Sequence, residues 1–250
     1  MKSKTVAAAL AAFVSVIAAV TVADAADLVI AGPPQSGFVL KALIPLFEAA
    51  SGDKVTASFE PGTATLAKIN SGAGLDLAIM GPDQIDGLAK EGKIAGGRAD
   101  VFISGVGLAV KAGAPKPDIS TVEALKKTLL AAKSVARSNA RSGLYFASVL
   151  ERLGIADQMK SKILVVQSGP VGAAAANGDA EIAVQQLTEL LPVPGIEVIG
   201  PLPAEVQTRI VYAAGVPVSA KQPDAAKALI KFFASPAAAP VIKAKGLQPG

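Results

Sequence analysis

The sequence predicts an α/β protein of two lobes, with two inter-lobe crossings of the chain and a central cleft. Short apolar strands alternate with helices, a pattern typical of mostly parallel sheets whose helices begin at one edge. A long extended segment at 100–111 contains two glycines, and a second apolar extended segment follows at 209–218. We interpret these segments as the strands that leave the first lobe and return to it. Lobe one is then 26–104 plus 209–250, and lobe two is 105–208.

The first 25 residues have the pattern of an export signal. Lys2 and Lys4 precede an apolar run over 5–22, and Ala23–Asp24–Ala25 supplies a small-residue cleavage site. A retained membrane anchor is the alternative, because the run reaches the roughly 18–20 residues that span a bilayer. No later segment is long and apolar enough to do so. We therefore expect an exported protein, cleaved near Ala25, with no stable membrane insertion afterwards.

The composition limits the chemistry that is available. The chain contains no Cys and no His, so it lacks thiolates, the commonest general base and the commonest metal ligand. It has no serine-nucleophile elbow, no phosphate-binding loop of the Walker type and no block of basic residues. We expect no catalytic residues, metal, cofactor or nucleic-acid partner, although a Ser–Lys pair or a carboxylate pair stays open.

The first third of the chain repeats a strand–helix unit. Apolar or alternating runs predict strands, and helical spacing of apolar residues such as Phe38 and Ile44 predicts helices. Ser36 is the expected N-cap of the first helix, and Thr63 or Thr65 that of the second. The strands are expected at 27–31, 55–59 and 75–80, and the helices at 37–50, 66–70 and 84–91.

The same alternation continues in the middle of the chain. A helix over 122–132 has Ser120 as its expected cap, with Glu123 completing a capping box. Strands follow at 134–137, 163–166, 181–185 and 196–199, with helices that begin at Ser142–Gly143 and Gly169–Val171. Two helices close the chain, at 225–234 and at 236–245, the second capped by Ser235.

Four of the expected helix starts follow a strand and carry Ser, Thr or Gly. Helix N-termini present unpaired N–H groups and the positive end of the helix dipole, so they favour anions. Ordinary capping explains any one of them, but two per lobe at the strand ends predict a shared anion pocket. The residues are Ser36 and Gly37, Thr63 and Thr65, Ser142 and Gly143, and Gly169 and Val171.

Two arginines and two glutamines extend this predicted pocket. Arg137 and Arg141 flank the loop before Ser142, and an Arg fork can hold a carboxylate in a bidentate manner. Solvated surface arginines are the alternative, and Arg141 is the stronger candidate because it directly precedes Ser142. Gln185 and Gln186 end a strand at the same edge, and strand alternation points one of them at the cleft without deciding which.

Several stretches resemble the molybdate-binding-type periplasmic solute-binding proteins of ABC transporters. The stretches include LVIAGPPQSG, VTASFEPGTATLAKI, GLDLAIMGPDQIDGLAKEGKI and RSGLYFASVLERLGI, and the similarity covers nearly all of the chain after the signal. The resemblance implies a type II periplasmic-binding fold whose lobes close on a small anion. It also implies ligand contacts at Ser36, at Thr63 or Thr65, at Ser142, at Val171, and at Gln185 or Gln186.

The chain departs from the pattern of that family at two of these contacts. The small-residue stretch that ends in Ser-Leu is replaced by residues 32–37, and the late Tyr position is a Gln. Arg137 and Arg141 add charge where oxyanion sites use neutral dipoles. These changes favour an organic carboxylate over molybdate. We expect a monomeric periplasmic binding protein, not an enzyme, that delivers a small anion to an ABC permease; a periplasmic sensor that presents the anion to a receptor, or molybdate or tungstate uptake proper, is the alternative.

Overall fold

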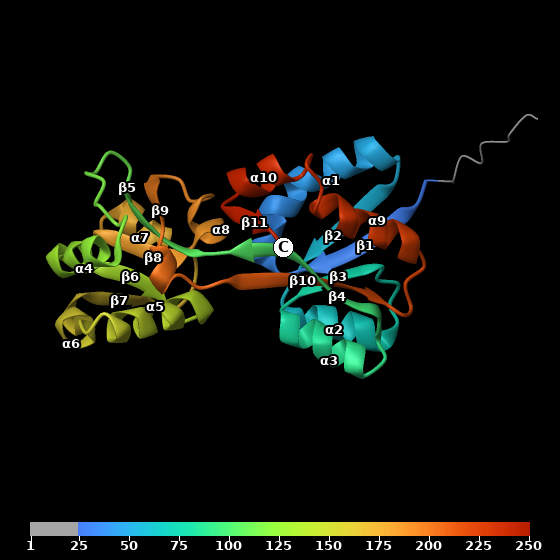
Figure 1. Cartoon of the computed structure of the whole chain (residues 1–250), viewed down its shortest axis with the longest axis horizontal. Helices are drawn as coiled ribbons and strands as arrows, with labels where there is room; N and C mark the ends of the chain where they lie inside the picture. The colour runs from blue at the N-terminus through green and yellow to red at the C-terminus, as the bar shows by residue number, and fades with distance from the viewer. Residues whose placement is uncertain (1–24) are drawn as a thin grey trace, which may run out of the picture.

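The computed structural model of the chain describes residues 25–250. The expected export signal ends at Ala25, so all but its last residue lies outside the described residues. The rest of the chain forms two sheets of six and five strands, each with its own helices. Figure 1 shows the two sheets side by side, joined near the middle of the molecule by extended strands. The expected two-lobed α/β fold is confirmed.

The six-stranded sheet has the order β11-β4-β10-β3-β1-β2. Its strands are β1 (Asp27–Gly32), β2 (Lys54–Phe59), β3 (Leu77–Met80), β4 (Ile94–Ser104), β10 (Ile210–Pro217) and β11 (Leu247–Pro249). The helices of this lobe are η1 (Pro34–Ser36), α1 (Gly37–Ser51), α2 (Gly62–Ser71), α3 (Pro82–Lys90), α9 (Pro223–Phe233) and α10 (Ala239–Ala244).

The five-stranded sheet has the order β7-β6-β8-β5-β9. Its strands are β5 (Val106–Lys111), β6 (Val135–Ser138), β7 (Ile163–Val166), β8 (Ile182–Gln186) and β9 (Ile196–Pro201). Its helices are α4 (Val122–Ala131), α5 (Arg141–Arg152), α6 (Ala156–Met159), η2 (Lys160–Lys162), α7 (Gly172–Asn177), α8 (Leu187–Leu190) and η3 (Ala204–Val206).

Both sheets are mixed, whereas the alternation of elements predicts mostly parallel ones. Strand β1 is parallel to β2 and β3, and β6 is parallel to β7 and β8. Strand β10 is antiparallel to β3 and β4, and β5 is antiparallel to β8 and β9. The reason is that β5 and β10 each enter a lobe from the other and run away from the crossing, opposite to the strands that end there. The carboxyl ends of β1–β3 and β6–β8 therefore face the junction of the two sheets.

The long segment expected over 100–111 is two strands that belong to different sheets. Strand β4 ends at Ser104, Gly105 interrupts the pairing, and β5 begins at Val106. The return strand β10 pairs with β4 alone at its start, where Ile210 lies opposite Ser104. The two predicted crossing segments are thus adjacent in space (Figure 1).

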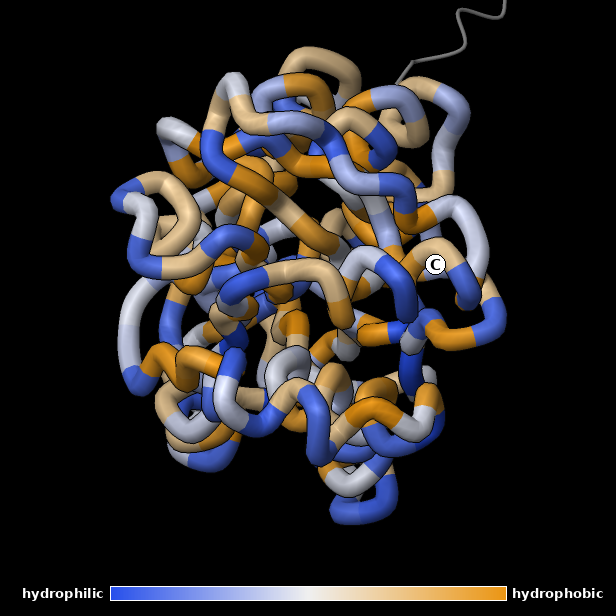
Figure 2. Tube along the Cα trace, turned by 90° about the vertical axis from the view of Figure 1, so that its left-hand side faces the viewer, coloured by the Kyte–Doolittle hydropathy of each residue, from blue (hydrophilic) through white to orange (hydrophobic). Residues whose placement is uncertain are grey.

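Apolar helix faces cover the sheets. Helix α1 buries Val39, Leu40, Leu43 and Phe47, and each such side chain contributes roughly 1.5–3 kcal/mol when fully buried. Phe38, expected on that face, is only half-buried and lines a pocket instead. Hydrophobic stretches concentrate in the interior of the chain trace, and many peripheral turns are hydrophilic (Figure 2). Within residues 25–250, no helix combines the length and the hydrophobicity needed to cross a membrane.

The cap expected for α1 is confirmed in position, and the cap expected for α2 is wrong. Ser36 is the N-cap of α1, but its hydroxyl donates to the Pro33 carbonyl oxygen at 2.7 Å and caps no helical N–H. Helix α2 begins at Gly62, directly after Pro61, so Thr63 and Thr65 lie inside it. The physical reason is the same in both places, because a proline at a helix start needs no N–H partner and fixes φ in the extended turn that leads in.

Two further caps differ by a few residues. Thr121 rather than Ser120 caps α4, and its hydroxyl accepts from the Ala124 N–H at 3.1 Å. Ser235 accepts from the Ala238 N–H at 3.3 Å, but the residues between form a turn and α10 starts at Ala239. These shifts are local, because neighbouring hydroxyl residues compete for the same cap position.

Candidate ligand-binding site

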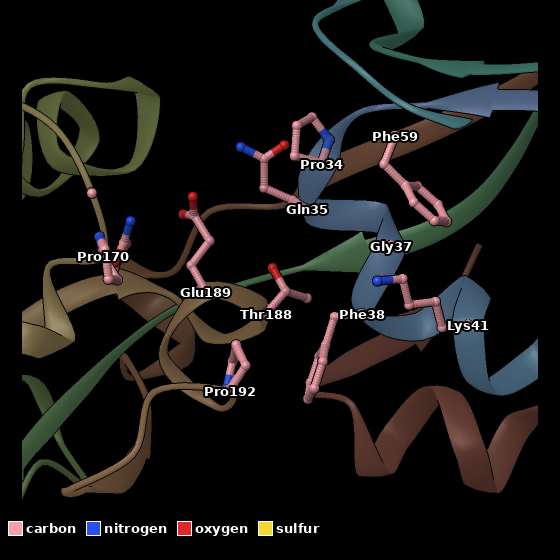
Figure 3. Close-up of a pocket in the computed structure, with 12 residues that line it drawn as sticks. Pro34, Gln35, Gly37, Phe38, Lys41, Phe59, Pro170, Thr188, Glu189 and Pro192 are labelled. Carbon is pink, nitrogen blue, oxygen red and sulfur yellow. The ribbon is translucent and has the colours of Figure 1, made fainter. Parts of the chain in front are cut away.

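A pocket of about 480 Å³ lies between the two lobes. Lobe one contributes the η1–α1 turn and the end of β2, and lobe two contributes the loop before α7, the end of β8 and the start of α8 (Figure 3). Its volume is in the range of small-molecule sites, roughly 300–1,000 Å³. The lining residues are Pro34, Gln35, Gly37, Phe38, Lys41, Phe59, Gly169, Pro170, Gln185, Thr188, Glu189 and Pro192.

The lobe-one wall is built by the tight turn after β1. Gly32 is required there, because a Cβ at this position would lie 2.7 Å from the Ser36 hydroxyl oxygen. The η1 segment directs Gln35 toward lobe two. Helix α1 then places Phe38 and Lys41 one helical turn apart at the pocket. The Lys41 amino group points into the pocket and lies 5.6 Å from the centre of the Phe59 ring (Figure 3).

The lobe-two wall contains buried amide and carboxyl groups. The Gln185 side-chain oxygen accepts a hydrogen bond from the Val171 N–H at 3.0 Å, which ties the end of β8 to the start of α7. Burial raises the pKa of the Glu189 carboxyl, and the nearby amides of Gln35 and Gln185 oppose the rise. Gln35 and Glu189 extend toward one another from opposite lobes (Figure 3). The pocket thus places one carboxylate among neutral donors.

Behind Glu189, a tyrosine of the returning strand connects the lobes. The Tyr212 hydroxyl donates to the Gln186 side-chain oxygen at 3.0 Å, and both groups are buried. Burial is the main cause that raises the pKa of Tyr212, and the negative charge of Glu189 raises it further. The adjacent Thr188 hydroxyl and the positive charge of Arg141 lower the pKa of Tyr212 and so oppose this rise. Tyr212 therefore stays protonated at ordinary pH. Thr188 is 2% exposed, and its hydroxyl has no hydrogen-bond partner of ordinary geometry.

The predicted site residues divide into those that line this pocket and those behind it. Gly37, Gly169 and Gln185 are lining residues. Ser36 and Val171 are fully buried directly behind them, the first donating to Pro33 and the second to Gln185. Gln186 points to the hinge tyrosine instead of the pocket, so of the two glutamines it is Gln185 that faces the pocket.

The predicted residues at the start of α5 are not among the pocket-lining residues. Arg137 donates to the Ser138 carbonyl oxygen at 3.0 Å, and Ser142 is buried. Gly143 packs so closely that an added Cβ would collide with the Ser138 carbonyl. Arg141 is exposed, but its charge acts on Tyr212 and hence reaches the junction between the lobes.

The predicted residues of α2 also lie outside the pocket lining. Thr63 is exposed, and Thr65 is buried with its hydroxyl 3.4 Å from a Glu60 carboxylate oxygen. Of the four helix starts predicted to share a pocket, those of α1 and α7 contribute residues to the lining of this pocket, and those of α2 and α5 do not.

Sequence reasoning missed the side chains that give the pocket its character. They include Gln35, Phe38, Lys41, Phe59, Thr188 and Glu189. One of them carries a signal that could have been used, because Lys41 lies four residues after Gly37 on one helix face. Among the described residues, no group of three or more His, Cys, Asp or Glu side chains is arranged to hold a metal ion.

The fold and the inter-lobe pocket define the class of solute-binding proteins that hold a ligand between two α/β lobes. The sequence model of the bacterial extracellular solute-binding protein family matches residues 28–248, and the chain belongs to this family. The expected solute-binding family is confirmed, and the likeness to proteins of the molybdate-binding type is one of fold.

The similar proteins include one named as an enzyme and others named as binding proteins of transporters. The chain is 34% identical over 217 residues to an aconitate isomerase from a Pseudomonas species, covering 84% of this chain and 83% of the relative. Among solved structures, a substrate-binding domain described as part of a molybdenum ABC transporter from Clostridium difficile superposes with a TM-score of 0.78 at 21% identity, covering 90% of this chain and 99% of that one. The periplasmic molybdate-binding protein of Azotobacter vinelandii gives a TM-score of 0.64 at 23% identity, covering 88% and 98%. At these identities the two structures establish the fold.

Proposed function

We propose that this protein is exported to the periplasm, where it captures a small organic carboxylate in the cleft between its lobes and delivers it to an ABC transporter. The observation that carries the proposal is the make-up of the inter-lobe pocket. Phe38, Phe59 and several prolines offer apolar walls, while Gln35, Lys41 and buried hydroxyl and amide groups offer donors. Apolar walls favour a carbon skeleton, and a bare tetrahedral oxyanion would leave them uncovered.

Family membership supports a role as the binding component of a transporter. In this proposal the signal is cleaved near Ala25, the protein acts as a monomer, and lobe one (26–104 plus 209–250) closes against lobe two (105–208) to present the loaded surface to the permease. A periplasmic sensor is the alternative for the same binding event. Neighbouring permease and ATPase genes would favour transport, and a neighbouring histidine-kinase gene would favour sensing.

A thermal-shift panel tests the ligand class. The wild-type protein is heated with citrate, tricarballylate, cis- and trans-aconitate, succinate, molybdate, tungstate, sulfate and phosphate. A ligand at 100 times its Kd stabilises the native state by about 2.7 kcal/mol, which corresponds to a rise in Tm of about 5–10 °C for a protein of this size. We expect such a rise for di- or tricarboxylates. A rise with molybdate or tungstate and none with any carboxylate would instead assign the protein to oxyanion uptake.

Isomerisation of an unsaturated polycarboxylate is a second candidate function. It is favoured by the 34% identity to a protein named aconitate isomerase and by the presence of a carboxylate, Glu189, in the pocket. A carboxylate that takes a proton from an allylic carbon and returns it to the other end of the double bond moves that bond without any cofactor. In this candidate Glu189 is the base, and Lys41 offsets the developing negative charge.

NMR in D₂O separates binding from turnover. The protein is incubated with cis-aconitate and, separately, with trans-aconitate, and a Glu189→Gln sample is the control. Binding without catalysis leaves both compounds unchanged and undeuterated. Conversion of one into the other with deuterium uptake, lost in Glu189→Gln, would make the protein an enzyme.

A further inference from the structure

We propose that Glu189 makes the cleft selective for anions that bring a hydrogen-bond donor, either a hydroxyl group or one retained acidic proton, and that it excludes fully ionised oxyanions. The inference rests on the proposed capture of a carboxylate in this pocket. It adds the chemical property by which the pocket would select its ligand. Its observations are the position of Glu189, the charges that face it and an unpartnered hydroxyl beside it.

Glu189 lies in the pocket wall without a cationic partner. None of the ion pairs among the described residues includes it. Its nearest polar neighbours are the side-chain amides of Gln35 and Gln185 and the backbone N–H of Gln186, which are neutral donors. A carboxylate held in this way keeps acceptor capacity that points into the pocket, where it meets whatever the ligand presents.

The charged and titratable groups that face Glu189 come from three other elements. Tyr212 on β10 is buried and its hydroxyl already donates to Gln186, so it does not supply a proton. Arg141 on α5 acts on Tyr212 from the lobe-two side, and Lys41 on α1 reaches the pocket from lobe one. Glu189 is therefore the carboxyl group in the pocket wall that can share a proton with an incoming anion.

Electrostatics then decides which anions are accepted. Two carboxylates a few ångströms apart in a partly buried site cannot both be ionised, so they share one proton. The shared proton makes a short O–H···O⁻ hydrogen bond, about twice as strong as a neutral one. While Glu189 is ionised, it repels an anion that has no proton and no hydroxyl, and molybdate and sulfate belong to this group near neutral pH. Such an anion is accepted only together with a proton taken up from solvent.

An unpartnered hydroxyl beside Glu189 independently indicates a ligand. Thr188 lines the pocket and is 2% exposed, and its hydroxyl lies beside that of Tyr212 without a hydrogen bond of ordinary geometry. The Thr188 oxygen is buried in the pocket wall. A buried hydroxyl that lacks a partner is costly, so a ligand oxygen or an ordered water in the pocket is its natural partner.

The proposal has a defined pH signature. Burial raises the pKa of Glu189 in the free protein, and a bound anion raises it further. The bound form therefore holds more protons than the free form between these two pKa values. Over that window affinity falls about tenfold for each pH unit of increase if one proton is taken up.

The test measures affinity, proton uptake and selectivity in the wild type and in Glu189→Gln. Calorimetry with tricarballylate, a tricarboxylate without a hydroxyl group, in two buffers of different ionisation enthalpy at pH 6, 7 and 8 gives the number of protons taken up on binding. We expect uptake of up to one proton by the wild type and close to none by Glu189→Gln, whose amide donates to an ionised carboxylate instead. Binding of molybdate, weak in the wild type, should strengthen at least tenfold in Glu189→Gln. Glu205→Gln, a change at an exposed residue outside the pocket lining, is the matched control and should behave as wild type.

The outcomes are distinguishable from failure of the proposed function. If the wild type binds molybdate and no carboxylate, the proposed function fails. If tricarballylate, which has no hydroxyl group, binds with no proton uptake between pH 6 and 8, or if Glu189→Gln keeps the wild-type selectivity, carboxylate capture stands and the role of Glu189 is overturned. The proton-uptake measurement uses the wild type alone, so it decides the question even if the variant does not fold.

Discussion

At the scale of single residues, the cleft combines features that a stable core would avoid. The Thr188 hydroxyl is buried without a partner, Glu189 is a partly buried carboxylate without a cation, and Lys41 points into the pocket from the other lobe. The first two features cost free energy in the unliganded protein, and a ligand that supplies the missing partner can compensate each of them. Stability and binding should therefore respond in opposite directions to changes here.

Replacement of Thr188 by Val tests this opposition. Val has the same shape without the hydroxyl, so removal of an unsatisfied buried group should leave the unliganded protein equally stable or more stable, by up to about 1–3 kcal/mol. Affinity for the carboxylate should fall. Differential scanning calorimetry and titration calorimetry measure the two effects.

Ser138→Ala is the matched control for this change. Ser138 carries the other buried hydroxyl without a partner, but it does not line the pocket. The Ser138→Ala variant should change stability as Thr188→Val does, and its affinity for the carboxylate should equal that of the wild type. Equal loss of affinity in both variants would place the ligand beyond the pocket and nearer to α5.

Replacement of Lys41 by Gln, compared with Arg141→Ala, identifies the cation that holds the ligand. A hydrogen bond to a charged group contributes about 1.5–3 kcal/mol, so loss of the responsible cation should weaken carboxylate binding by about 10- to 100-fold. We expect the larger loss for Lys41→Gln, because Lys41 lines the pocket and Arg141 does not. A larger loss for Arg141→Ala in titration calorimetry would favour the site predicted from the sequence at the start of α5.

At the scale of elements, the Gln207 side chain adds a bridge between the two crossings. The Gln207 oxygen accepts from the Val106 N–H at 2.9 Å, and its amide nitrogen donates to the Val106 carbonyl oxygen at 2.9 Å. Gly105 gives this side chain room, because a Cβ there would lie 3.0 Å from the Gln207 nitrogen. Gln207 thus joins the start of β5 to the segment that leads into β10, on the two strands about which the lobes would move.

Replacement of Gln207 by Leu should loosen this junction. The Val106 N–H would lose its acceptor, at a cost of about 1–3 kcal/mol for an unsatisfied buried donor. Urea unfolding measures the loss, and hydrogen exchange at Val106 should accelerate.

Gln167→Leu is the control for this change. Gln167 is exposed and accepts a hydrogen bond from Asn139 at 2.8 Å, so its loss should change stability by no more than about 0.5 kcal/mol. Equal losses of stability in the two variants would show that Gln207 does not stabilise the hinge.

At the scale of the whole molecule, the arrangement supports closure of the lobes about the two crossings. Small-angle scattering of the wild type should give a smaller radius of gyration with a saturating carboxylate than without it. Gln207→Leu should keep this difference, since the variant alters the hinge and leaves the pocket lining intact. The thermal shift of the same sample shows that ligand is bound. An unchanged radius of gyration in that sample would contradict closure.

The sequence by itself determined the elements and the order of the lobes. Apolar periodicity located β1, β7 and α9 to within a few residues, and the glycine-containing segment and its late counterpart predicted both crossings. These predictions succeeded because the periodicity of a strand or helix is a local property, set by neighbours two to four residues away. Caps such as Thr121 were missed by one residue, because adjacent hydroxyl residues compete on nearly equal terms.

Only the tertiary structure decided the strand directions and the membership of the pocket. The antiparallel placement of β5 and β10 follows from where each strand enters its sheet, which no local pattern records. Gln35 and Glu189 are far apart in the sequence and meet only because the carboxyl ends of two sheets face each other across the hinge. The chemistry of the cleft depends on such long-range pairs, and their proximity is fixed by sheet order and packing.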